Sequence, residues 1–191
     1  GTKNDSTIDV EVVDIDYDND MDLVLANRDG QQNYIYINDG ELNFNKKVPY
    51  GSGIDITRSV SVSDINKDGF LDIICANIDE PNFIYFGDSI FSFKKKVMFD
   101  KSLDKSYSID SADLDFDGDI DIVVGNSNST NSVFYNEENG NIWTKIKLSQ
   151  KKFNTYDIKI IDINNDGRPD IIESNSDEKN IFYYNKPNSN K

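Results

Sequence analysis

The stretch DLDFDGDIDIVVGN at residues 113–126 decides the fold, because three close variants of it occur elsewhere in the chain. The variants are DIDYDNDMDLVLAN at 14–27, DINKDGFLDIICAN at 64–77 and DINNDGRPDIIESN at 162–175. Their first aspartates follow one another at intervals of 50, 49 and 49 residues. A constant interval of this size is typical of repeat architectures, in which each repeat forms one supersecondary unit.

Each repeat is predicted to consist of β-strands. Short apolar runs precede and follow every acidic stretch, and they are rich in Val, Ile, Tyr and Phe and bounded by Gly, Asn and Asp. This composition favours strands, and no long segment shows the 3.6-residue stripe of a helix. Runs such as FIYF are apolar on both faces, which indicates sheets that stack face to face.

The sequence therefore predicts an all-β fold, a β-propeller built from four four-stranded blade repeats of 49–50 residues. We expect one domain over residues 1–191, with repeats at approximately 8–57, 58–106, 107–155 and 156–191. The last repeat ends before a fourth strand, and the residues before the first repeat are too few and too polar to supply it. Three arrangements stay open: a four-bladed ring with a three-stranded last blade, half of an eight-bladed ring made by two chains, or a piece of a larger propeller.

The 191 residues include 35 acidic and 20 basic ones, which gives a formal net charge of −15. Phosphate backbones and anionic membrane surfaces repel such a chain, so we expect no nucleic-acid partner and no direct membrane insertion. The absence of histidine excludes a His base and His-ligated zinc, and the single cysteine excludes an intrachain disulfide. No apolar run approaches the ~20 residues of a membrane span. The opening GTKNDSTIDV has no signal-peptide character.

Each acidic stretch begins with nine residues of the pattern D-x-[DN]-x-D-[GN]-x-x-D, which places side-chain oxygens at positions 1, 3, 5 and 9. Calcium takes roughly six to eight oxygen ligands, and a tight loop with alternate side chains pointing inward supplies them. Gly or Asn at position 6 permits the positive φ of a sharp turn. Position 7 varies freely, which fits a ligand that contributes its backbone carbonyl. The predicted metal ligands are Asp14, Asp16, Asp18, Asp20 and Asp22; Asp64, Asn66, Asp68, Phe70 and Asp72; Asp113, Asp115, Asp117, Asp119 and Asp121; and Asp162, Asn164, Asp166, Arg168 and Asp170.

A solvated acidic turn and an EF-hand are the alternatives to this kind of calcium loop. The first and third loops each place five aspartates in nine positions, and so many carboxylates repel one another unless a cation neutralises them. An EF-hand requires a bidentate Glu at position 12 and flanking helices, whereas position 12 here is Leu25, Cys75, Val124 or Glu173 and the flanks are strands. About four structural Ca²⁺ per chain would change the net charge from −15 to −7, since each ion adds two charges. Mg²⁺ is disfavoured because it retains its waters.

These stretches resemble the FG-GAP/VCBS repeat family, the calcium-loop blades of integrin α-subunit propellers and of related bacterial and fungal propeller proteins. The resemblance rests on the nine-residue pattern, on the apolar strand ending in Asn that follows it, and on the later segments NDGELNF, GDSIFSF and ENGNIW. It covers essentially the whole chain, although Asn19 replaces Gly in the first loop and four repeats stand where the integrin head has seven. The resemblance implies structural ions in loops between the first and second strands of each blade, on the face away from any ligand.

We expect a calcium-stabilised binding or adhesion module of an extracytoplasmic protein, secreted or at the cell surface. Open surface loops of this kind suit calcium near ~10⁻⁴–10⁻³ M, an extracellular level. The predicted ligand is a glycan, because related propellers include lectins, or else a protein partner. Two alternatives stay open: a His-free propeller domain of a polysaccharide-active enzyme, for which no catalytic residue stands out, and a purely structural segment that forms a homodimer by completing a ring. The candidate ligand loops are Arg28–Gln32, Ile78–Asn82, Ser127–Asn131 and Ser176–Lys179.

Four further predictions concern residues outside the acidic loops. Cys75 is expected to be a small buried hydrophobic residue against a neighbouring blade, and Trp143 is expected to pack in the core. The Asn that ends each second strand is expected to cap the turn that follows it. The lysines at 94–96 are expected to protect an outer edge strand against pairing with another chain.

Overall fold

The computed structural model describes residues 5–186, so both ends of the predicted domain, residues 1–4 and 187–191, lie outside it. The described part contains fifteen β-strands and no helix, which confirms the all-β prediction. Within residues 5–186, no helix is long and apolar enough to cross a membrane.

The strands form four antiparallel groups that follow the four sequence repeats, and we number these groups as blades 1 to 4. Blade 1 contains β1 (Thr7–Val13), β2 (Asp22–Asn27), β3 (Asn33–Ile37) and β4 (Lys46–Tyr50). Blade 2 contains β5 (Thr57–Ser63), β6 (Asp72–Asn77), β7 (Asn82–Tyr85) and β8 (Lys96–Asp100). Blade 3 contains β9 (Lys105–Ala112), β10 (Asp121–Ser129), β11 (Ser132–Asn136) and β12 (Trp143–Lys147). Blade 4 contains β13 (Phe153–Ile161), β14 (Asp170–Asn175) and β15 (Ile181–Tyr183).

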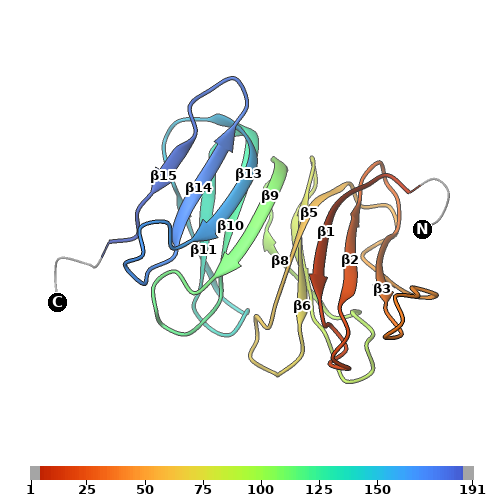
Figure 1. Ribbon diagram of the computed structural model, residues 1–191. Helices are drawn as coiled ribbons and strands as arrows, with labels where there is room; N and C mark the ends of the chain where they lie inside the picture. The colour runs from red at the N-terminus through yellow and green to blue at the C-terminus, as the bar shows by residue number, and fades with distance from the viewer. Residues whose placement is uncertain (1–4, 187–191) are drawn as a thin grey trace.

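The first strands of the four blades lie next to one another in the middle of the molecule, and the later strands extend outward from them (Figure 1). Within each blade the strands are ordered as they occur in the sequence. This is a propeller-like arrangement of curled sheets. Blades 3 and 4 are also joined by backbone pairing, because the end of β10 pairs with the start of β13 at Ser127↔Asn154 and Ser129↔Phe153. The sequence carries no pattern that signals this extra pairing.

The core consists of three apolar layers, one between each pair of successive blades. Strand β6 shows why its sequence is apolar at almost every position: Ile73 and Cys75 pack towards blade 1, and Ile74 and Ala76 pack towards blade 3. Cys75 is a buried free thiol, as predicted, and burial raises its pKa well above the ordinary value. Trp143 packs against Phe99 of blade 2, with ring centroids 5.8 Å apart.

Successive blades are also joined by a hydrogen bond that recurs at each junction. The side-chain amide of an Asn at the start of the third strand donates to a hydroxyl at the start of the next blade. The three pairs are Asn33–Thr57, Asn82–Ser106 and Asn131–Thr155, with distances of 2.8, 3.0 and 2.7 Å. We call these residues the junction asparagines and junction hydroxyls. Since all are buried, each bond joins its two blades at a fixed position.

The first and last blades each have one face that no blade of this chain covers. Val10 and Val12 on β1 are about half exposed, and so are Phe182 and Tyr184 at the end of blade 4. The described strands therefore show propeller-type blades with two open end faces.

Glu173 on β14 is fully buried between blades 3 and 4, at the position that Leu25, Cys75 and Val124 occupy in the other blades. Neither carboxylate oxygen has a hydrogen bond of normal geometry. Burial raises the pKa of Glu173, and the nearby side chains of Asn131 and Tyr183 oppose only part of that shift. A buried carboxyl whose neighbours compensate only part of its lost hydration destabilises the junction whenever it is ionised.

Replacing Glu173→Val is therefore expected to stabilise the protein by about 1–3 kcal/mol at pH 8, which raises the melting temperature by several degrees. The pKa of Glu173 is higher in the folded protein than in the unfolded chain, where it is near 4.5. Below the unfolded pKa the neutral carboxyl does not reduce the stability of the wild type. That stability is lost as pH rises through the folded-state pKa. The gain should accordingly shrink towards pH 5. Thermal melts at both pH values check this, with Glu173→Gln as the control that removes the charge and keeps the shape. A Glu173→Val variant no more stable than wild type at pH 8 contradicts the assignment.

Candidate metal centres and the opposite end of the molecule

The four acidic loops connect the first and second strands of the blades, at residues 14–22, 64–72, 113–121 and 162–170. We number them loops 1 to 4, after their blades. The connections that follow β1 and β5 turn at the lower side of the molecule in Figure 1. Because every first strand enters its loop in the same direction, all four loops lie at one end of the blades.

Backbone hydrogen bonds to side-chain oxygens give the four loops the same shape. The Asp at position 1 accepts two backbone N–H donors from the loop, at N–O distances of 2.7–3.1 Å. The Asp at position 5 accepts the N–H of position 7 at 2.8–2.9 Å. These bonds fix the carboxylates within the loop before any ion binds.

The backbone of each loop adopts the left-handed conformation twice. Position 6 does so at Asn19, Gly69, Gly118 and Gly167, with φ between 75° and 91°, as the sequence predicts. Position 4 also has positive φ, at Tyr17, Lys67, Phe116 and Asn165. Residues with a bulky side chain rarely adopt this conformation, and four different residue types at one position gave no signal of it.

Loops 1 and 3 bring three carboxylates together in a way that suits a cation. Oxygens of Asp14, Asp16 and Asp18 lie within 4.8 Å of one another, and those of Asp113, Asp115 and Asp117 do the same. The Oδ1 atom of Asp16 is buried without a hydrogen-bond partner. Burial, followed by the neighbouring carboxylates, raises the pKa of Asp16. A bound cation would neutralise this repulsion and use the unpartnered oxygen.

Loops 2 and 4 carry Asn66 and Asn164 at position 3, where loops 1 and 3 have Asp. Each amide oxygen accepts the backbone N–H of position 5, Asp68 or Asp166, at 2.9 Å. The shape of the loop is kept while its negative charge is smaller. We therefore expect loops 1 and 3 to hold a cation more tightly than loops 2 and 4.

The Asp at position 9 has a structural task that the sequence pattern did not reveal. This Asp is buried in all four loops. One carboxylate oxygen accepts the backbone N–H of position 2 at 2.9–3.3 Å. The other oxygen accepts a backbone N–H at the end of the third strand at 2.8–2.9 Å. Position 9 thus ties the loop to the sheet. Burial raises the pKa of Asp72 to about 7 and that of Asp121 to about 6. Whether this Asp also ligates an ion stays a prediction.

Neighbouring loops touch through positions 4 and 7. Lys67 of loop 2 forms an ion pair with Asp119 of loop 3. The guanidinium of Arg168 in loop 4 lies 4.9 Å from the ring centroid of Phe116 in loop 3. In these two pairs the side chain at position 7 contacts the side chain at position 4 of the preceding loop.

The candidate ligand loops lie at the other end of the blades, after the asparagines of the second strands. In blade 3, β10 continues through Ser129, so residues 127–129 of the predicted loop belong to a strand. The asparagines cap the loops as predicted: their side-chain amides donate to backbone carbonyls four or five residues later at 2.6–2.9 Å. Two cavities open at this end and share Tyr107. One of about 200 Å³ is lined by the first strands of all four blades, including Arg58 and Tyr156. The other, about 590 Å³, is lined by Asp79, Asn154 and the segment 127–129.

Part of the predicted ligand surface is wrong. Asn82 and Asn131 were included in the candidate loops, but both are buried junction asparagines that bond to the next blade. Gln32 also has a structural role, because its side-chain amide donates a hydrogen bond to the backbone carbonyl of Tyr50. Within these loops, the exposed residues available to a ligand are those nearer the tip, such as Asp29 and Asn128.

The repeated blades and their similar acidic loops define a repeat protein of the β-propeller type. The FG-GAP-like repeat pattern matches residues 14–75, 64–124 and 113–173, so the chain belongs to the FG-GAP-like repeat family. A comparison with curated proteins gave no match.

Solved structures that resemble this chain do so at low sequence identity. Two crystal structures of BBS1N in complex with ARL6DN, soaked with lead or with mercury, align with TM-scores of 0.63 and 0.64 and 14% identity. Both alignments cover 95% of this chain and 55% of the BBS1N chain, so this chain spans about half of that relative. The V. cholerae biofilm matrix protein Bap1 aligns with a TM-score of 0.49 and 19% identity, over 86% of this chain and 23% of Bap1.

Proposed function

We propose that this chain is a calcium-stabilised binding or adhesion module of an extracytoplasmic protein, with one structural Ca²⁺ in each acidic loop. The observation that carries the proposal is the preorganised carboxylate cluster of loop 1, in which the buried Oδ1 of Asp16 has no partner. The ligands would be the side-chain oxygens of positions 1, 3, 5 and 9 together with the carbonyl of position 7. Calcium near ~10⁻⁴–10⁻³ M outside the cell would occupy open loops of this kind.

We also propose that residues 1–191 form one propeller-type domain with the four repeats given above. Ions at one end of the blades would hold each loop against its neighbour. The opposite end would then be free for ligand recognition.

Binding is favoured over catalysis by how the carboxylates beside the two cavities are used. Asp9 accepts hydrogen bonds from Ser59 and from the backbone of Val60, Asp157 accepts one from Ser108, and Asp104 accepts one from Ser129. These carboxylates hold strands and loops in place. Asp79, the other carboxylate that lines the larger cavity, is exposed. Glycoside hydrolysis uses a pair of carboxyl groups, and one exposed carboxyl does not supply a pair, so we assign no catalytic residue.

A glycan is the ligand class that fits the opposite end best. The larger cavity combines the ring of Tyr107 with the amide of Asn154 and with hydroxyl groups of the segment 127–129. An aromatic face with amide and hydroxyl groups around it matches the apolar face and hydroxyl edge of a sugar ring. A protein partner is the second candidate, and the solved complexes of BBS1N with ARL6DN are consistent with it.

A glycan array in calcium buffer, followed by calorimetry with the best hit, tests this proposal. The double variant Tyr107→Ala/Asn154→Ala is expected to weaken binding at least about tenfold, because it removes the ring and one amide from the cavity. Leu42→Ala, an exposed residue on the turn before β4, is the control and should bind like wild type. Unchanged affinity in the double variant would refute the site. If no glycan on the array bound and a protein partner did, the ligand would be a protein and not a glycan.

A further inference from the structure

We propose that the open face of blade 4 docks onto the open face of blade 1 of a second copy of this chain, so that two chains close one ring of eight blades. The two faces carry the two halves of the junction that joins blades 1 to 2, 2 to 3 and 3 to 4. This inference goes beyond the ligand proposed above, and only its calcium dependence rests on the proposed function.

Exposure at matching positions shows what the open faces lack. Val10 on β1 is 45% exposed, whereas Val60 at the same position in blade 2 is 1% exposed because blade 1 covers it. On the other open face Phe182 is 48% exposed, whereas Ile84 at the same position is fully buried against blade 3. Each open face thus presents a surface that is core elsewhere in the same molecule.

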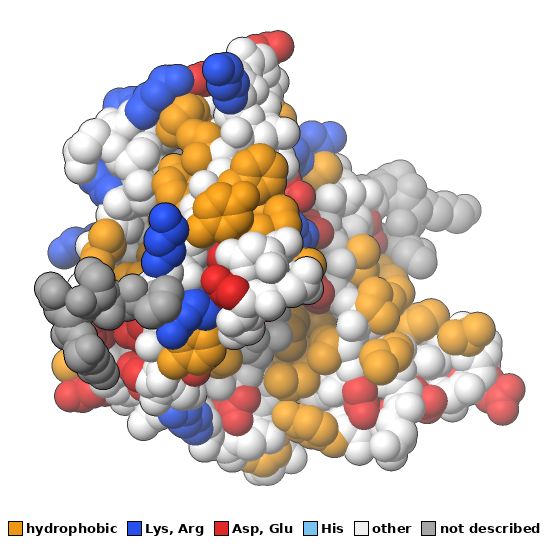
Figure 2. All heavy atoms as spheres, turned by 60° about the vertical axis from the view of Figure 1, so that its left-hand side comes forward, with side chains coloured by type: hydrophobic (Ala, Val, Ile, Leu, Met, Phe, Trp, Pro, Cys, Tyr) orange, Lys and Arg blue, Asp and Glu red, His pale blue; other side chains and the backbone are white. Residues whose placement is uncertain are grey.

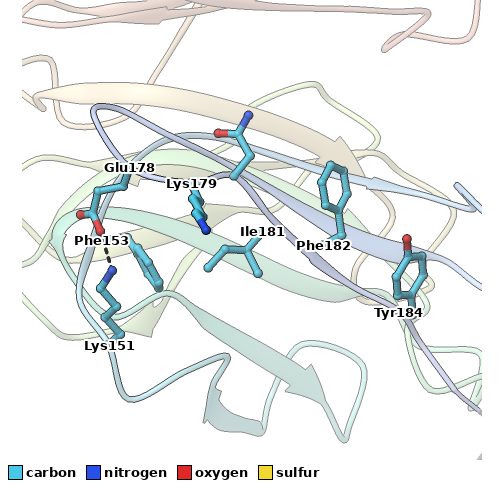
Figure 3. Close-up of a pocket in the computed structure, with 8 residues that line it drawn as sticks. Lys151, Phe153, Glu178, Lys179, Ile181, Phe182 and Tyr184 are labelled. Atoms are coloured by element: carbon cyan, nitrogen blue, oxygen red, sulfur yellow. Dashed lines mark hydrogen bonds and ion pairs between the residues drawn. The ribbon is translucent and has the colours of Figure 1, made fainter.

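The hydrophobic side chains of blade 4 gather on the side that comes forward in Figure 2, with lysines around them. Figure 3 shows Phe182 and Tyr184 on this blade beside a cavity of about 650 Å³. The ion pair between Lys151 and Glu178, 2.7 Å long, lies at the other end of that cavity. Exposed aromatic surface beside an open cavity is the kind of surface that proteins cover with a partner.

The recurring junction hydrogen bond is also half made at each end of the chain. Asn180 stands at the junction-asparagine position of blade 4, and Thr7 stands at the junction-hydroxyl position of blade 1. Asn180 is exposed, whereas the three junction asparagines are buried. Its Oδ1 accepts the backbone N–H of Asn175, and the junction asparagines accept the backbone N–H of the corresponding Asn in their own blades. The hydroxyl of Thr7 donates to Asn27, just as Thr155 donates to Asn175. In the docked pair, the Thr7 hydroxyl of one copy would therefore accept a hydrogen bond from the Asn180 side-chain amide of the other copy.

A second half-made contact lies at the acidic loops. Asn136 donates to the carbonyl of Ile65 in loop 2, and Asn185 donates to the carbonyl of Leu114 in loop 3, at 3.1 and 2.6 Å. Asn38 holds the same position in blade 1 and would donate to the carbonyl of Ile163 in loop 4 of the other copy.

These features select a second copy as the occupant. The blade 4 face fits the blade 1 face, and neither fits a copy of itself, so the chains associate head to tail. Two such contacts would close a ring of two chains. The outer part of the blade 1 face is partly covered, because the Tyr36 hydroxyl donates to Asp5, so contact would centre on β1. Two chains of charge −15 repel each other, and filled calcium loops would lessen that repulsion. Docking is therefore expected to need calcium.

Sedimentation velocity in calcium buffer, over a hundredfold range of protein concentration, tests the proposal. A species of twice the 21.7 kDa chain mass is expected, and EDTA should shift it towards monomer. Val10→Asp and Phe182→Asp should each give monomers, while Leu42→Asp, whose side chain lies outside both faces, should remain dimeric. Mixing the two monomeric variants should restore a weaker, open dimer, because the intact blade 4 face of Val10→Asp can meet the intact blade 1 face of Phe182→Asp while the second junction carries both substitutions. A cooperative thermal melt of each variant would confirm that it folds, at a melting temperature lowered only by the loss of association.

Crosslinking distinguishes a second copy from closure within one chain. Thr7→Cys/Asn180→Cys, treated with a short bis-maleimide, should give a covalent dimer, and either cysteine alone should not; the buried Cys75 is protected from the reagent. An internal crosslink in a monomer would show a self-closed ring and overturn the proposal. A monomeric wild type at every concentration, or a dimer unaffected by both face variants, would overturn it as well.

Discussion

Removing calcium is expected to lower the melting temperature of this protein by at least about 10 °C. A ligand at a hundredfold excess over its dissociation constant stabilises the native state by about 2.7 kcal/mol per site. In a domain of this size each kcal/mol corresponds to roughly 2–4 °C, so even two filled loops exceed that shift. Thermal melts at pH 8 with calcium or with EDTA measure it, since the pKa of Asp72 is raised to about 7 and this carboxyl is ionised at pH 8.

Magnesium at the same concentration is the control, and it should restore little of the lost stability because it retains its waters. Calorimetric titration of the EDTA-treated protein then counts the sites. We expect the strongest binding in loops 1 and 3, so Asp16→Ala and Asp115→Ala should remove the tightest sites. Melting temperatures that agree within a degree or two with and without calcium would show that the loops are not calcium sites.

Asp72→Ala is expected to destabilise the protein by about 3–5 kcal/mol in EDTA, and by more with calcium, where the loss of a proposed ligand adds to this effect. Asp72 is fully buried and accepts the N–H of Ile65 and the N–H of Gly87, each at 2.9 Å. The substitution leaves two buried backbone donors unpaired, each at a cost of about 1–3 kcal/mol. Denaturant unfolding in calcium and in EDTA measures both free energies.

The matched control is Asp68→Ala in the same loop. Asp68 is exposed and accepts the N–H of Phe70, so its loss in EDTA should cost no more than about 1 kcal/mol. With calcium the same variant should lose the contribution of one ion. If Asp72→Ala were harmful only in calcium, position 9 would be a ligand without the structural role described above.

The repeats, the strands and the acidic loops could be predicted because they depend on local sequence. The nine-residue pattern fixes the loop, and the apolar runs on both sides fix the strands that enclose it. Contacts between repeats were harder to predict. Asn131 reads as an ordinary loop residue in the sequence, and only the packing of blade 4 against blade 3 shows that its amide bonds to Thr155. The burial of Glu173 was missed for the same reason, since a carboxyl at the end of a strand usually faces water.

The positive φ at position 4 of the loops was missed for a different reason. Tyr17, Lys67 and Phe116 have no side-chain property that favours the left-handed region. The hydrogen bonds made by positions 1 and 5 impose this conformation on whichever residue stands there. A consensus of residue types cannot reveal a position whose conformation is set by its neighbours.

The junction asparagines and hydroxyls occupy the same positions in every blade, so the molecule lengthens only in whole units. Duplicating a complete repeat of 49–50 residues would place every donor opposite its acceptor again. An insertion of one residue within a strand would instead turn its apolar side chains to the opposite face. Natural variation in chain length among such proteins should therefore occur in steps of one blade, with intermediate lengths confined to the turns at either end of the strands.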